Sequence, residues 1–369
     1  MENFIVSARK YRPATFSTVV GQDPITTTLK NSIATNHLGQ AYLFCGPRGV
    51  GKTTCARIFA KTINCLNLSD DIEACNECES CKSFNDSASF SIHELDAASN
   101  NSVEDIRSLI DQVRIPPQVG KYSIYIIDEV HMLSQAAFNA FLKTLEEPPR
   151  HAIFILATTE KHKILPTILS RCQIFDFQRI KVEDTVEHLA EVAEKEQVAY
   201  EREALTVIAL KSDGGMRDAL SIFDQIVSFS EKNVTYAKTI ENLNFLDYEY
   251  FFKITQYFLD QDYASALILF DEILDKGFDS HNFLVGLSGH FRDLLVCKEP
   301  QTAQLLEVGE SIKARYLEQS KISSVDFLYK ALDLANKFDI NYKASKNKRL
   351  HVELALLQFC NILKKKALN

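Results

Sequence analysis

The 369-residue sequence has no long hydrophobic run, no secretory signal and no excess of basic residues. No stretch of about eighteen apolar residues occurs, so a membrane-spanning helix is not expected. The N-terminus, MENFIVSARKYRP, holds only a short apolar patch, too short for the core of a signal peptide. We therefore expect a cytoplasmic protein with reduced thiols and no membrane partner. The net charge of −8 argues against a protein that binds nucleic acid over its whole surface, but it leaves a local basic lining open.

The stretch from Ala41 to Ala60, AYLFCGPRGVGKTTCARIFA, has the pattern of a short strand, a glycine-containing turn and the start of a helix. Residues 46–53 match G-x-x-x-x-G-K-[ST], in which the glycines let backbone N–H groups surround phosphate oxygens. Lys52 would reach the terminal phosphates, and the Thr53 hydroxyl would bind Mg²⁺. A glycine turn with a solvated lysine is the alternative, but the strand-to-helix context favours a nucleotide site.

Two acidic residues follow a second apolar run. The segment from Tyr122, YSIYIID, is typical of a central parallel strand and ends with Asp128, which Glu129 follows. Beside a phosphate loop, Asp128 would hold the Mg²⁺ shell through water, and Glu129 would orient the water that attacks the γ-phosphate. Capping of the following helix is the alternative for both acids. His131 is expected to be a structural or interface residue, because no second ligand is spaced to join it.

Three polar residues further along each have an ordinary interpretation and a functional one. Thr159 follows an apolar strand at 152–157, where polar groups of a parallel sheet converge. Arg171, in the sequence LSRC, is either a surface arginine or an arginine finger that acts on the nucleotide of a neighbouring subunit. Arg217 lies in the first turn of a helix after a double-glycine break, where a local salt bridge to Asp218 or Asp224 is the alternative to a functional role.

Four cysteines lie within seventeen residues, in the pattern C-x9-C-x2-C-x2-C. Four thiolates are the ligand count of a closed tetrahedral Zn²⁺ site, with no position left for a substrate or water. An iron–sulfur cluster uses the same count, and buried unligated cysteines are the structural alternative. The repeated x2 spacing among polar residues favours structural zinc, with folding of this insertion coupled to the metal. The expected ligands are Cys65, Cys75, Cys78 and Cys81.

The remaining elements follow from apolar spacing and end signals. Asp23 and Pro24 are the expected N-cap and first-turn proline of a helix that runs to about Thr35. That helix would pack on the sheet, and the segment before it is a candidate for holding an adenine base. Strands are expected at 91–96 and 173–177, and helices after Ser102, over 134–147 and over 182–210. Beyond residue 243 aromatic and aliphatic residues recur at helical spacing, which predicts an all-helical domain, with the basic run 343–349 as an exposed turn.

Taken together, the motifs resemble the gamma/tau subunit family of bacterial DNA polymerase III, the motor of the sliding-clamp loader. The motifs are ARKYRPATFSTVVGQ, GPRGVGKTT, the four-cysteine insertion, IIDEVHMLS, FNAFLKTLEEPP, LATT, LSRC and GGMRDALS, in this order over residues 1 to about 225. The resemblance implies an α/β P-loop AAA+ domain at 1–178, a parallel sheet with helices on both faces and a zinc module at 65–81. It further implies a small helical lid at 179–242. The helical remainder, 243–369, is similar to the family's all-α collar in length and character only.

The resemblance also implies a role for individual residues. Thr159 would read the γ-phosphate, Arg217 would act from the lid of the same subunit and Arg171 would act on the adjacent one. Mg²⁺ would be held by Thr53 and Asp128, and zinc by the four cysteines. The implied catalytic set is Lys52, Asp128, Glu129, Thr159, Arg171 and Arg217. The implied ATP contacts are Ala8, Tyr11, Arg12, Val20, Gly46, Pro47, Arg48, Gly49, Val50, Gly51, Lys52, Thr53, Thr54 and Arg217.

The family's activity is ATP hydrolysis within the DNA polymerase III holoenzyme, which loads the sliding clamp onto primed DNA. The implied partners are the delta and delta-prime subunits, further copies of the chain, the clamp and primer-template DNA. The family's long form continues into domains that bind the helicase and the polymerase, and the sequence ends at Asn369 before any such region. Two other functions remain open. One is a ring scaffold that binds ATP with little hydrolysis, and the other is a different AAA+ motor such as a branch-migration helicase.

Overall fold

The computed structural model describes residues 5–86, 88–243, 246–306 and 308–364. The chain forms two compact units, one made of Met1–Val198 with Ile208–Ser228 and the other of Ala199–Val207 with Phe229–Asn369. Each unit is described by itself. Within the described ranges, no helix is both long and apolar enough to cross a membrane.

The first unit is built on a five-stranded parallel sheet with the order β2-β3-β4-β1-β5. Every residue of β1 and β4 is buried, which explains why these strands read as continuous apolar runs. Because all strands are parallel, their carboxyl ends meet at one edge of the sheet, and the candidate site residues follow those ends. The strands are β1 (Ala41–Cys45), β2 (Ile92–Asp96), β3 (Ser123–Asp128), β4 (Ala152–Thr158) and β5 (Gln173–Asp176).

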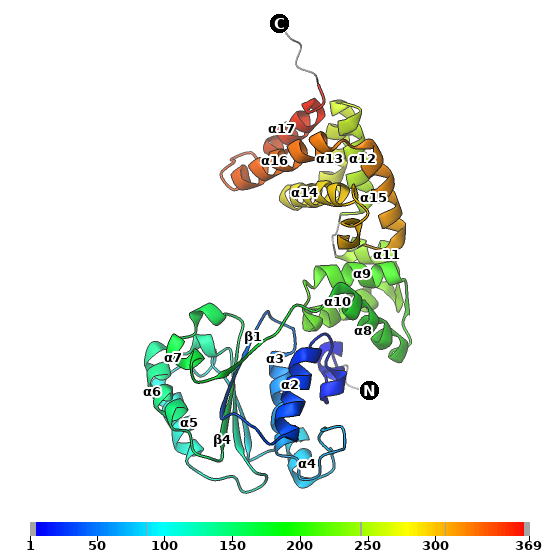
Figure 1. Ribbon diagram of the computed structural model, residues 1–369. Coiled ribbons are helices and arrows are strands. Elements are labelled where there is room, and N and C mark those ends of the chain that lie inside the picture. Colours follow the sequence, from blue (N-terminus) through cyan, green and yellow to red (C-terminus); the bar gives the residue numbers. More distant parts are fainter. Residues whose placement is uncertain (1–4, 87, 244–245, 307, 365–369) are drawn as a thin grey trace. The chain divides into compact units, whose positions relative to one another are not determined.

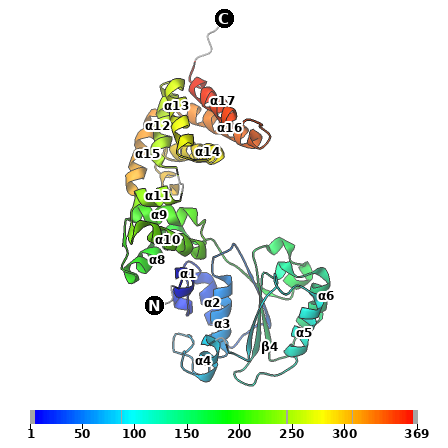
Figure 2. The same cartoon turned by 180° about the vertical axis from the view of Figure 1, so that it is seen from behind.

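Helices cover both faces of this sheet, as predicted for an α/β domain (Figure 1). One layer holds α2 (Asp23–Ala34), α3 (Lys52–Ile63) and α4 (Glu79–Asn85), and the other holds α5 (Val103–Val113), α6 (Gln135–Glu146) and α7 (Pro166–Leu169); the reverse view in Figure 2 shows the same two layers. Each layer has its own apolar core against the sheet. Short segments complete the domain: α1 (Ser7–Lys10), η1 (Phe16–Thr18), η2 (Val130–Met132) and η3 (Lys161–Lys163).

The predicted helix starts are partly confirmed. Ser102 and Ser134 cap α5 and α6, and their hydroxyls accept hydrogen bonds from the N–H groups of Asp105 and Ala137. The prediction that Asp23 caps α2 is wrong: Gln22 occupies the cap, and Asp23 is the first helical residue. An acidic residue in the first turn still interacts favourably with the positive end of the helix. The start of the helix was therefore predicted to within one residue.

The helical stretch predicted over 182–210 is interrupted in the structure. The helix α8 (Val182–Lys195) ends before Gln197, whose φ of 55° is left-handed and cannot continue a helix. The chain then forms β6 (Ala199–Tyr200), which pairs in parallel with β7 (Asn233–Val234), before α9 (Arg202–Lys211) begins. This small sheet joins segments far apart in the sequence, which helical periodicity cannot reveal. After α9, the double-glycine break precedes α10 (Met216–Ser230), as predicted.

The second unit is helical beyond β7, as the spacing predicted. Its core is dominated by aromatic side chains, among them Phe258, Phe291 and Phe359, whose rings contact one another. The basic run at 343–349 spans the connection between the last two helices and the first residues of the final one. The elements are α11 (Tyr236–Asn242), α12 (Tyr248–Leu259), α13 (Tyr263–Asp275), α14 (Ser280–Val296), η4 (Ala303–Leu305), α15 (Glu310–Ile322), α16 (Val325–Tyr342) and α17 (Lys348–Asn361).

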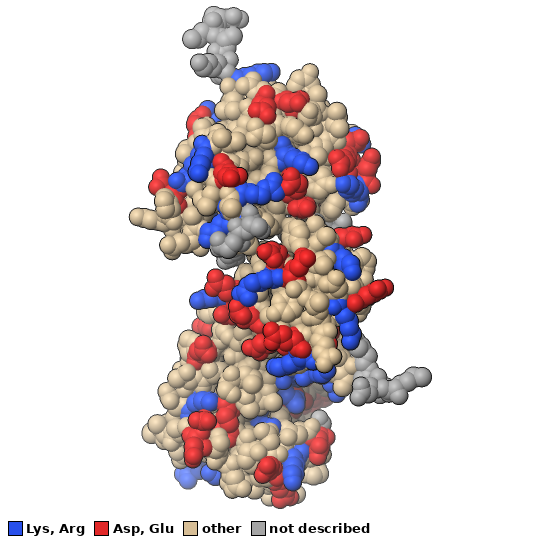
Figure 3. Space-filling model, turned by 90° about the vertical axis from the view of Figure 1, so that its right-hand side faces the viewer, with Lys and Arg blue, Asp and Glu red and all other residues tan. Residues whose placement is uncertain are grey.

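Basic and acidic side chains are interspersed over the described residues of the face drawn in Figure 3. Neither sign covers a whole unit on that face. This distribution agrees with the net charge of −8 and with the expectation that any phosphate binding is local.

Candidate functional site

The phosphate loop has the strand-to-helix context that its sequence predicted. It leaves the end of β1, and its last glycine, Gly51, takes a φ of 103°, a conformation that side chains other than glycine rarely adopt. A Cβ atom at Gly46 would lie 2.5 Å from the carbonyl oxygen of Phe177, so no larger residue fits there. The loop therefore requires glycine at both ends for steric reasons, and α3 starts at Lys52 directly behind it.

Lys52 is a buried lysine, with 6% of its surface exposed. Its ammonium group donates hydrogen bonds to the carbonyl oxygens of Gly46 and Pro47, at 2.8 and 2.6 Å. Burial lowers the pKa of Lys52, and the charges of Glu129 and Asp128 oppose that effect. A buried ammonium group beside two carboxylates at a glycine-rich loop is suited to binding an anion.

The two strand-end acids contact different partners. Thr53 donates a hydrogen bond of 2.6 Å to Asp128, so the hydroxyl and the carboxylate lie together as a pair of oxygen ligands for a hard cation. The carboxylate of Glu129 accepts hydrogen bonds from the hydroxyl and the N–H of Thr159, at 3.0 and 3.3 Å. Glu129 also has a left-handed backbone, with φ of 46° and ψ of 45°, which is uncommon outside glycine and asparagine.

His131 connects the residues around Glu129. Its Nδ1 lies 3.0 Å from the Thr158 hydroxyl and 3.4 Å from the Glu129 carboxylate, and its Nε2 lies 3.1 Å from Glu160. The imidazole is nearly buried, with 9% of its side chain exposed. The expected structural role therefore has a definite geometry, which could not be predicted because Glu160 is 29 residues away along the chain and belongs to no motif.

A cavity of about 650 Å³ lies over the phosphate loop, within the first unit. Its walls come from the N-terminal segment, the loop with the start of α3, Glu94 of β2, the end of β3, the segment before α8, and helices α8 and α10. The N–H of Arg217 lies 3.4 Å from the carbonyl oxygen of Gly49, which ties α10 to the loop. The predicted residues on its walls are Ala8, Tyr11, Arg12, Val20, Arg48, Gly49, Val50, Gly51, Lys52, Thr53, Thr54, Asp128, Glu129 and Arg217.

Four of the residues predicted for the nucleotide site do not line this cavity: Gly46, Pro47, Thr159 and Arg171. The first two accept hydrogen bonds from Lys52, and Thr159 contacts the cavity only through Glu129. Arg171 is partly exposed and forms an ion pair of 2.6 Å with Glu146 at the end of α6, and it also donates to the Thr167 carbonyl. Arg171 therefore does not contribute to the group of predicted residues that surround the phosphate loop.

Several wall residues were missed from the sequence. They include Ile180, His188, Met216 and Leu220, which come from the segment before α8, from α8 and from α10. Met216 and Leu220 lie in the GGMRDALS motif, which gives no sign that they line a cavity, and Ile180 and His188 lie in no motif. All four reach the cavity only when the helices fold back over the loop. The N-terminal segment is tied to the same helices, since the N–H of Ser7 donates to Asp224 at 2.7 Å and Tyr11 donates to Glu196.

The four predicted cysteines form one cluster. Cys65 follows α3, Cys78 precedes α4 and Cys81 lies within it. Their ligand atoms all lie within 4.8 Å of one another, and the sulfurs of Cys65 and Cys75 are 3.5 Å apart. Four sulfurs bound at about 2.3 Å to one tetrahedral zinc ion would be about 3.8 Å apart, so the cluster has the size that such an ion requires.

The four cysteines differ in their tendency to ionise. The N–H groups of Glu77 and Cys78 lower the pKa of Cys75 to about 6, whereas burial raises the pKa of Cys65 and that of Cys81. The ammonium of Lys61, on α3 and 5% exposed, donates hydrogen bonds to Asn76 and, at 2.8 Å, to Asn85. Burial lowers the pKa of Lys61, whereas the charges of Cys81, Cys65 and Cys75 raise it. A buried cation beside four thiols fits a metal site that carries net negative charge.

Three family models match consecutive parts of the chain. Residues 21–181 match the model described as DNA polymerase III, delta subunit. Residues 184–232 match the DNA polymerase III clamp loader subunit, ATPase lid domain. Residues 234–368 match DNA polymerase III subunits gamma and tau domain III. The three models together cover nearly the whole chain, from the phosphate-loop domain to the helical unit.

Curated relatives match over the same length. DNA polymerase III subunit tau of Bacillus subtilis is 43% identical over 95% of this chain and 62% of its own length. The tau subunit of Escherichia coli is 34% identical over 96% of this chain and 55% of its own length. DNA polymerase III subunit gamma of Buchnera aphidicola, from Baizongia pistaciae, is 34% identical over 98% of both chains. The chain therefore spans the full length of a gamma relative and little more than half of the tau relatives.

The solved structures that align with this chain are less similar to it than the curated relatives are. The Holliday junction branch migration motor RuvB of Thermotoga maritima aligns over 67% of this chain and 78% of its own, with 19% identity and a TM-score of 0.49. Both the identity and the TM-score of this alignment are low.

Proposed function

The chain belongs to the gamma/tau subunit family of bacterial DNA polymerase III, and on this premise we propose that it is an ATP-hydrolysing motor subunit of a sliding-clamp loader. The observation that carries the proposal is the convergence of Lys52, the Thr53–Asp128 pair and the Glu129–Thr159 pair at one cavity edge. These are the groups that a phosphoryl transfer to water needs: a cation for the phosphates, oxygen ligands for a metal and a carboxylate that orients the nucleophile.

In the proposed reaction, water attacks the γ-phosphorus of ATP and the bond from that phosphorus to the bridging oxygen of ADP breaks. Lys52 neutralises charge on the β- and γ-phosphates, and the backbone N–H groups of residues 48–53 face the same oxygens. Glu129 orients the attacking water, while Thr159 fixes the Glu129 carboxylate through two hydrogen bonds. Arg217 is carried by α10 and reaches the cavity from the lid side, where it would respond to the γ-phosphate.

Two metals complete the proposal. Thr53 and Asp128 are the residues that would hold Mg²⁺, which, when bound, neutralises charge on the phosphate oxygens. The four-cysteine cluster would hold one structural Zn²⁺, because its sulfurs have the spacing of a closed tetrathiolate site. No open ligand position remains there, so the zinc site takes no part in the phosphoryl transfer.

We further propose that Arg171 acts in trans, on ATP bound to an adjacent subunit. Its absence from the walls of the chain's own cavity supports this assignment. In the isolated chain its guanidinium is paired with Glu146, an exposed ion pair that contributes little stability and is easily exchanged for phosphate. The implied partners are delta and delta-prime subunits, further copies of the chain, the sliding clamp and primer-template DNA.

A clamp-loading assay with Lys52→Ala separates a motor from an ATP-binding scaffold. The assay would contain the delta and delta-prime subunits, the clamp and primed circular DNA, and it would measure the amount of clamp retained on DNA. We expect the wild-type chain to load clamp in an ATP-dependent manner and the variant, still assembled with its partners, to load none. Normal loading by assembled Lys52→Ala would favour the scaffold, and no loading by the wild type would contradict the proposed function.

A further inference from the structure

Glu73 lies in the loop between the first two cysteines of the tetrathiol cluster, yet its carboxylate is bound outside the cluster. Its two oxygens accept hydrogen bonds from the backbone N–H groups of Phe16 and Ser17, at 3.0 and 3.1 Å. The ammonium group of Lys30, on α2, lies 2.8 Å from the same carboxylate. Only 12% of the Glu73 side chain is exposed, so water does not compete freely for these bonds.

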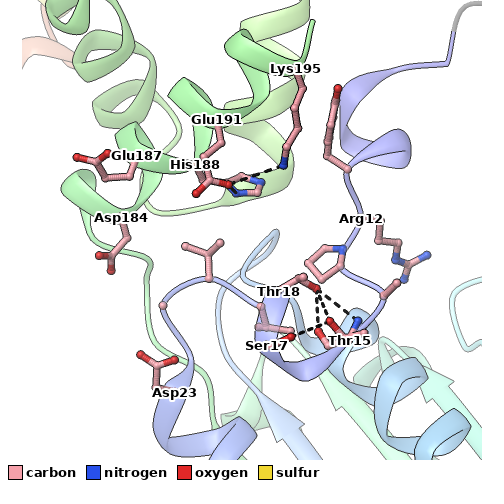
Figure 4. A pocket seen from close by; sticks show the side chains of 16 residues that line it. Arg12, Thr15, Ser17, Thr18, Asp23, Asp184, Glu187, His188, Glu191 and Lys195 are labelled. Carbon is pink, nitrogen blue, oxygen red and sulfur yellow. Dashed lines mark hydrogen bonds and ion pairs between the residues drawn. The ribbon is translucent and has the colours of Figure 1, made fainter. Parts of the chain in front are cut away.

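The two amides held by Glu73 begin the short helical turn η1. Such a turn has no internal acceptors for its first N–H groups, so an external acceptor is needed to satisfy them. Hydrogen bonds to an ionised carboxylate are roughly twice as strong as neutral ones. The Glu73 carboxylate therefore fixes the position of η1. Hydrogen bonds between Thr15 and Thr18 also stabilise this turn (Figure 4).

The turn η1 in turn holds the wall of the nucleotide cavity. Phe16 is 2% exposed and lies in the apolar core with Val19, which continues the turn and lines the cavity together with Val20. On the other side of the turn, Arg12 also lines the cavity and donates to the Thr54 hydroxyl at 3.1 Å. A displacement of η1 would move residues on both sides of it, which are the proposed adenine contacts.

The position of Glu73 depends in turn on the cysteine cluster. The loop from Ser69 to Glu73 closes on itself through hydrogen bonds between the two residues, at 3.0 and 3.1 Å. It is anchored on one side by Cys65, directly after α3, and on the other by Cys75, two residues beyond Glu73. The cysteine cluster is thus connected to the cavity in two ways. Helix α3 connects it to Lys52, and Glu73 connects it to η1.

We propose that the cysteine module braces the nucleotide cavity, and that Glu73 is the positioning residue through which metal occupancy of the cluster sets the affinity for nucleotide. Metal binding fixes both ends of the loop, and the loop fixes the η1 wall before nucleotide arrives. Without the metal, the wall must be ordered at the moment of binding, which weakens the affinity. This inference rests on the proposed function, because it assigns the cavity to a nucleotide.

The test compares Glu73→Gln with Asp71→Asn in the zinc-loaded chain of 369 residues. Glutamine keeps the size of the side chain and one oxygen acceptor but removes the charge, and Asp71 is an exposed acid of the same loop. Titration calorimetry with ADP and with a non-hydrolysable ATP analogue would measure affinity, and metal analysis would measure zinc content. We expect Glu73→Gln to bind nucleotide about fivefold more weakly or worse at full zinc content, and Asp71→Asn to bind as the wild type does.

A second measurement separates bracing from a general loss of structure. Hydrogen exchange at the amides of Phe16 and Ser17 should accelerate in Glu73→Gln, and zinc chelation should accelerate it similarly in the wild type. Chelation should then weaken nucleotide binding less in Glu73→Gln than in the wild type. Unchanged affinity in zinc-loaded Glu73→Gln, or an equal effect of chelation in both proteins, would overturn the inference. If the wild type bound no nucleotide at all, the proposed function would fail, while the exchange rates would still test the brace.

Discussion

The two units of the chain differ in what they bury. The first unit buries two lysines, Lys52 and Lys61, one beside the phosphate loop and one beside the four cysteines. Among the described residues of the second unit, no lysine, arginine, aspartate or glutamate is buried. Because a buried charge is unfavourable unless a partner compensates it, buried charges mark places where chemistry rather than packing has selected the residue. The buried lysines of the first unit lie at its proposed nucleotide and zinc sites, whereas the core of the second unit is made of apolar and aromatic side chains.

Removal of zinc should have the largest effect of the changes considered, and it should affect the first unit only. Chelation should destabilise the first unit by several kcal/mol, because metal binding to four thiolates is coupled to the folding of the residues around them. Differential scanning calorimetry of the full chain should show a lower unfolding temperature for the nucleotide-binding transition. The transition of the helical unit should not move, and an equal shift of both would show that the units do not behave separately.

The Phe291→Ala variant makes the converse test. Phe291 is fully buried in the second unit, and its ring contacts those of Phe258, Phe327 and Phe359. Its truncation should cost about 3–5 kcal/mol of unfolding free energy, because the cavity left behind can only partly collapse. Chemical denaturation would measure this loss. Nucleotide affinity should remain that of the wild type. Weaker binding of ADP by Phe291→Ala would show that the core of the second unit influences the nucleotide site of the first.

Glu129→Gln tests the chemistry of the first unit without changing its packing. The glutamine can still accept the hydrogen bond from Thr159, but it cannot polarise water as a carboxylate does. We expect the rate of ATP hydrolysis by the assembled complex to fall about 10²- to 10³-fold, with little change in ATP affinity. A single-turnover assay would separate the two quantities. Hydrolysis within a few-fold of the wild-type rate would remove Glu129 from the mechanism.

The smallest expected effect concerns the one buried histidine of the helical core. His290 is hydrogen-bonded to Tyr316 and Gln319, and burial lowers its pKa to about 3. Its pKa in the unfolded chain is near 6.5, so the unfolded state takes up the proton first. The second unit should therefore lose about 1.4 kcal/mol of stability per pH unit as the pH falls below 6.5.

Denaturation at pH 7.5 and at pH 5 would measure this dependence. The difference between the two values should shrink in His290→Asn and should remain in His37→Asn, which changes an exposed histidine of the first unit. An unchanged difference in His290→Asn would show that other groups carry the dependence.

The parts of the site that could be predicted are those fixed by local sequence. The phosphate loop needs glycine at 46 and 51 for steric reasons, and a tetrathiolate site needs four cysteines, so both patterns were visible without a structure. The same holds for the apolar strands, for the serine cap at 102 and for the start of the helix after Ser134. In each case a residue type is required by its immediate neighbours.

The parts that could not be predicted depend on contacts between distant segments. Glu73 reads as one more polar residue of an insertion, and only the folded chain brings it to Phe16 and Ser17. The strand β6, which pairs with β7, lies within the range 182–210 that was predicted to be helical from its apolar spacing. Gln22, not Asp23, caps α2, because helix boundaries are uncertain by a residue or two when several polar residues adjoin.

The most direct test of the motor assignment is the ATPase rate of the complex assembled with delta, delta-prime and the clamp, with and without primer-template DNA. The wild type and Arg171→Ala would be compared, together with their ATP affinities. We expect clamp and DNA to stimulate ATP hydrolysis by the wild type. We expect Arg171→Ala to bind ATP normally but to lose the stimulation, because Arg171 serves the neighbouring site. A rate that clamp and DNA leave unchanged would contradict the clamp-loader assignment, and full stimulation of Arg171→Ala would contradict the trans role.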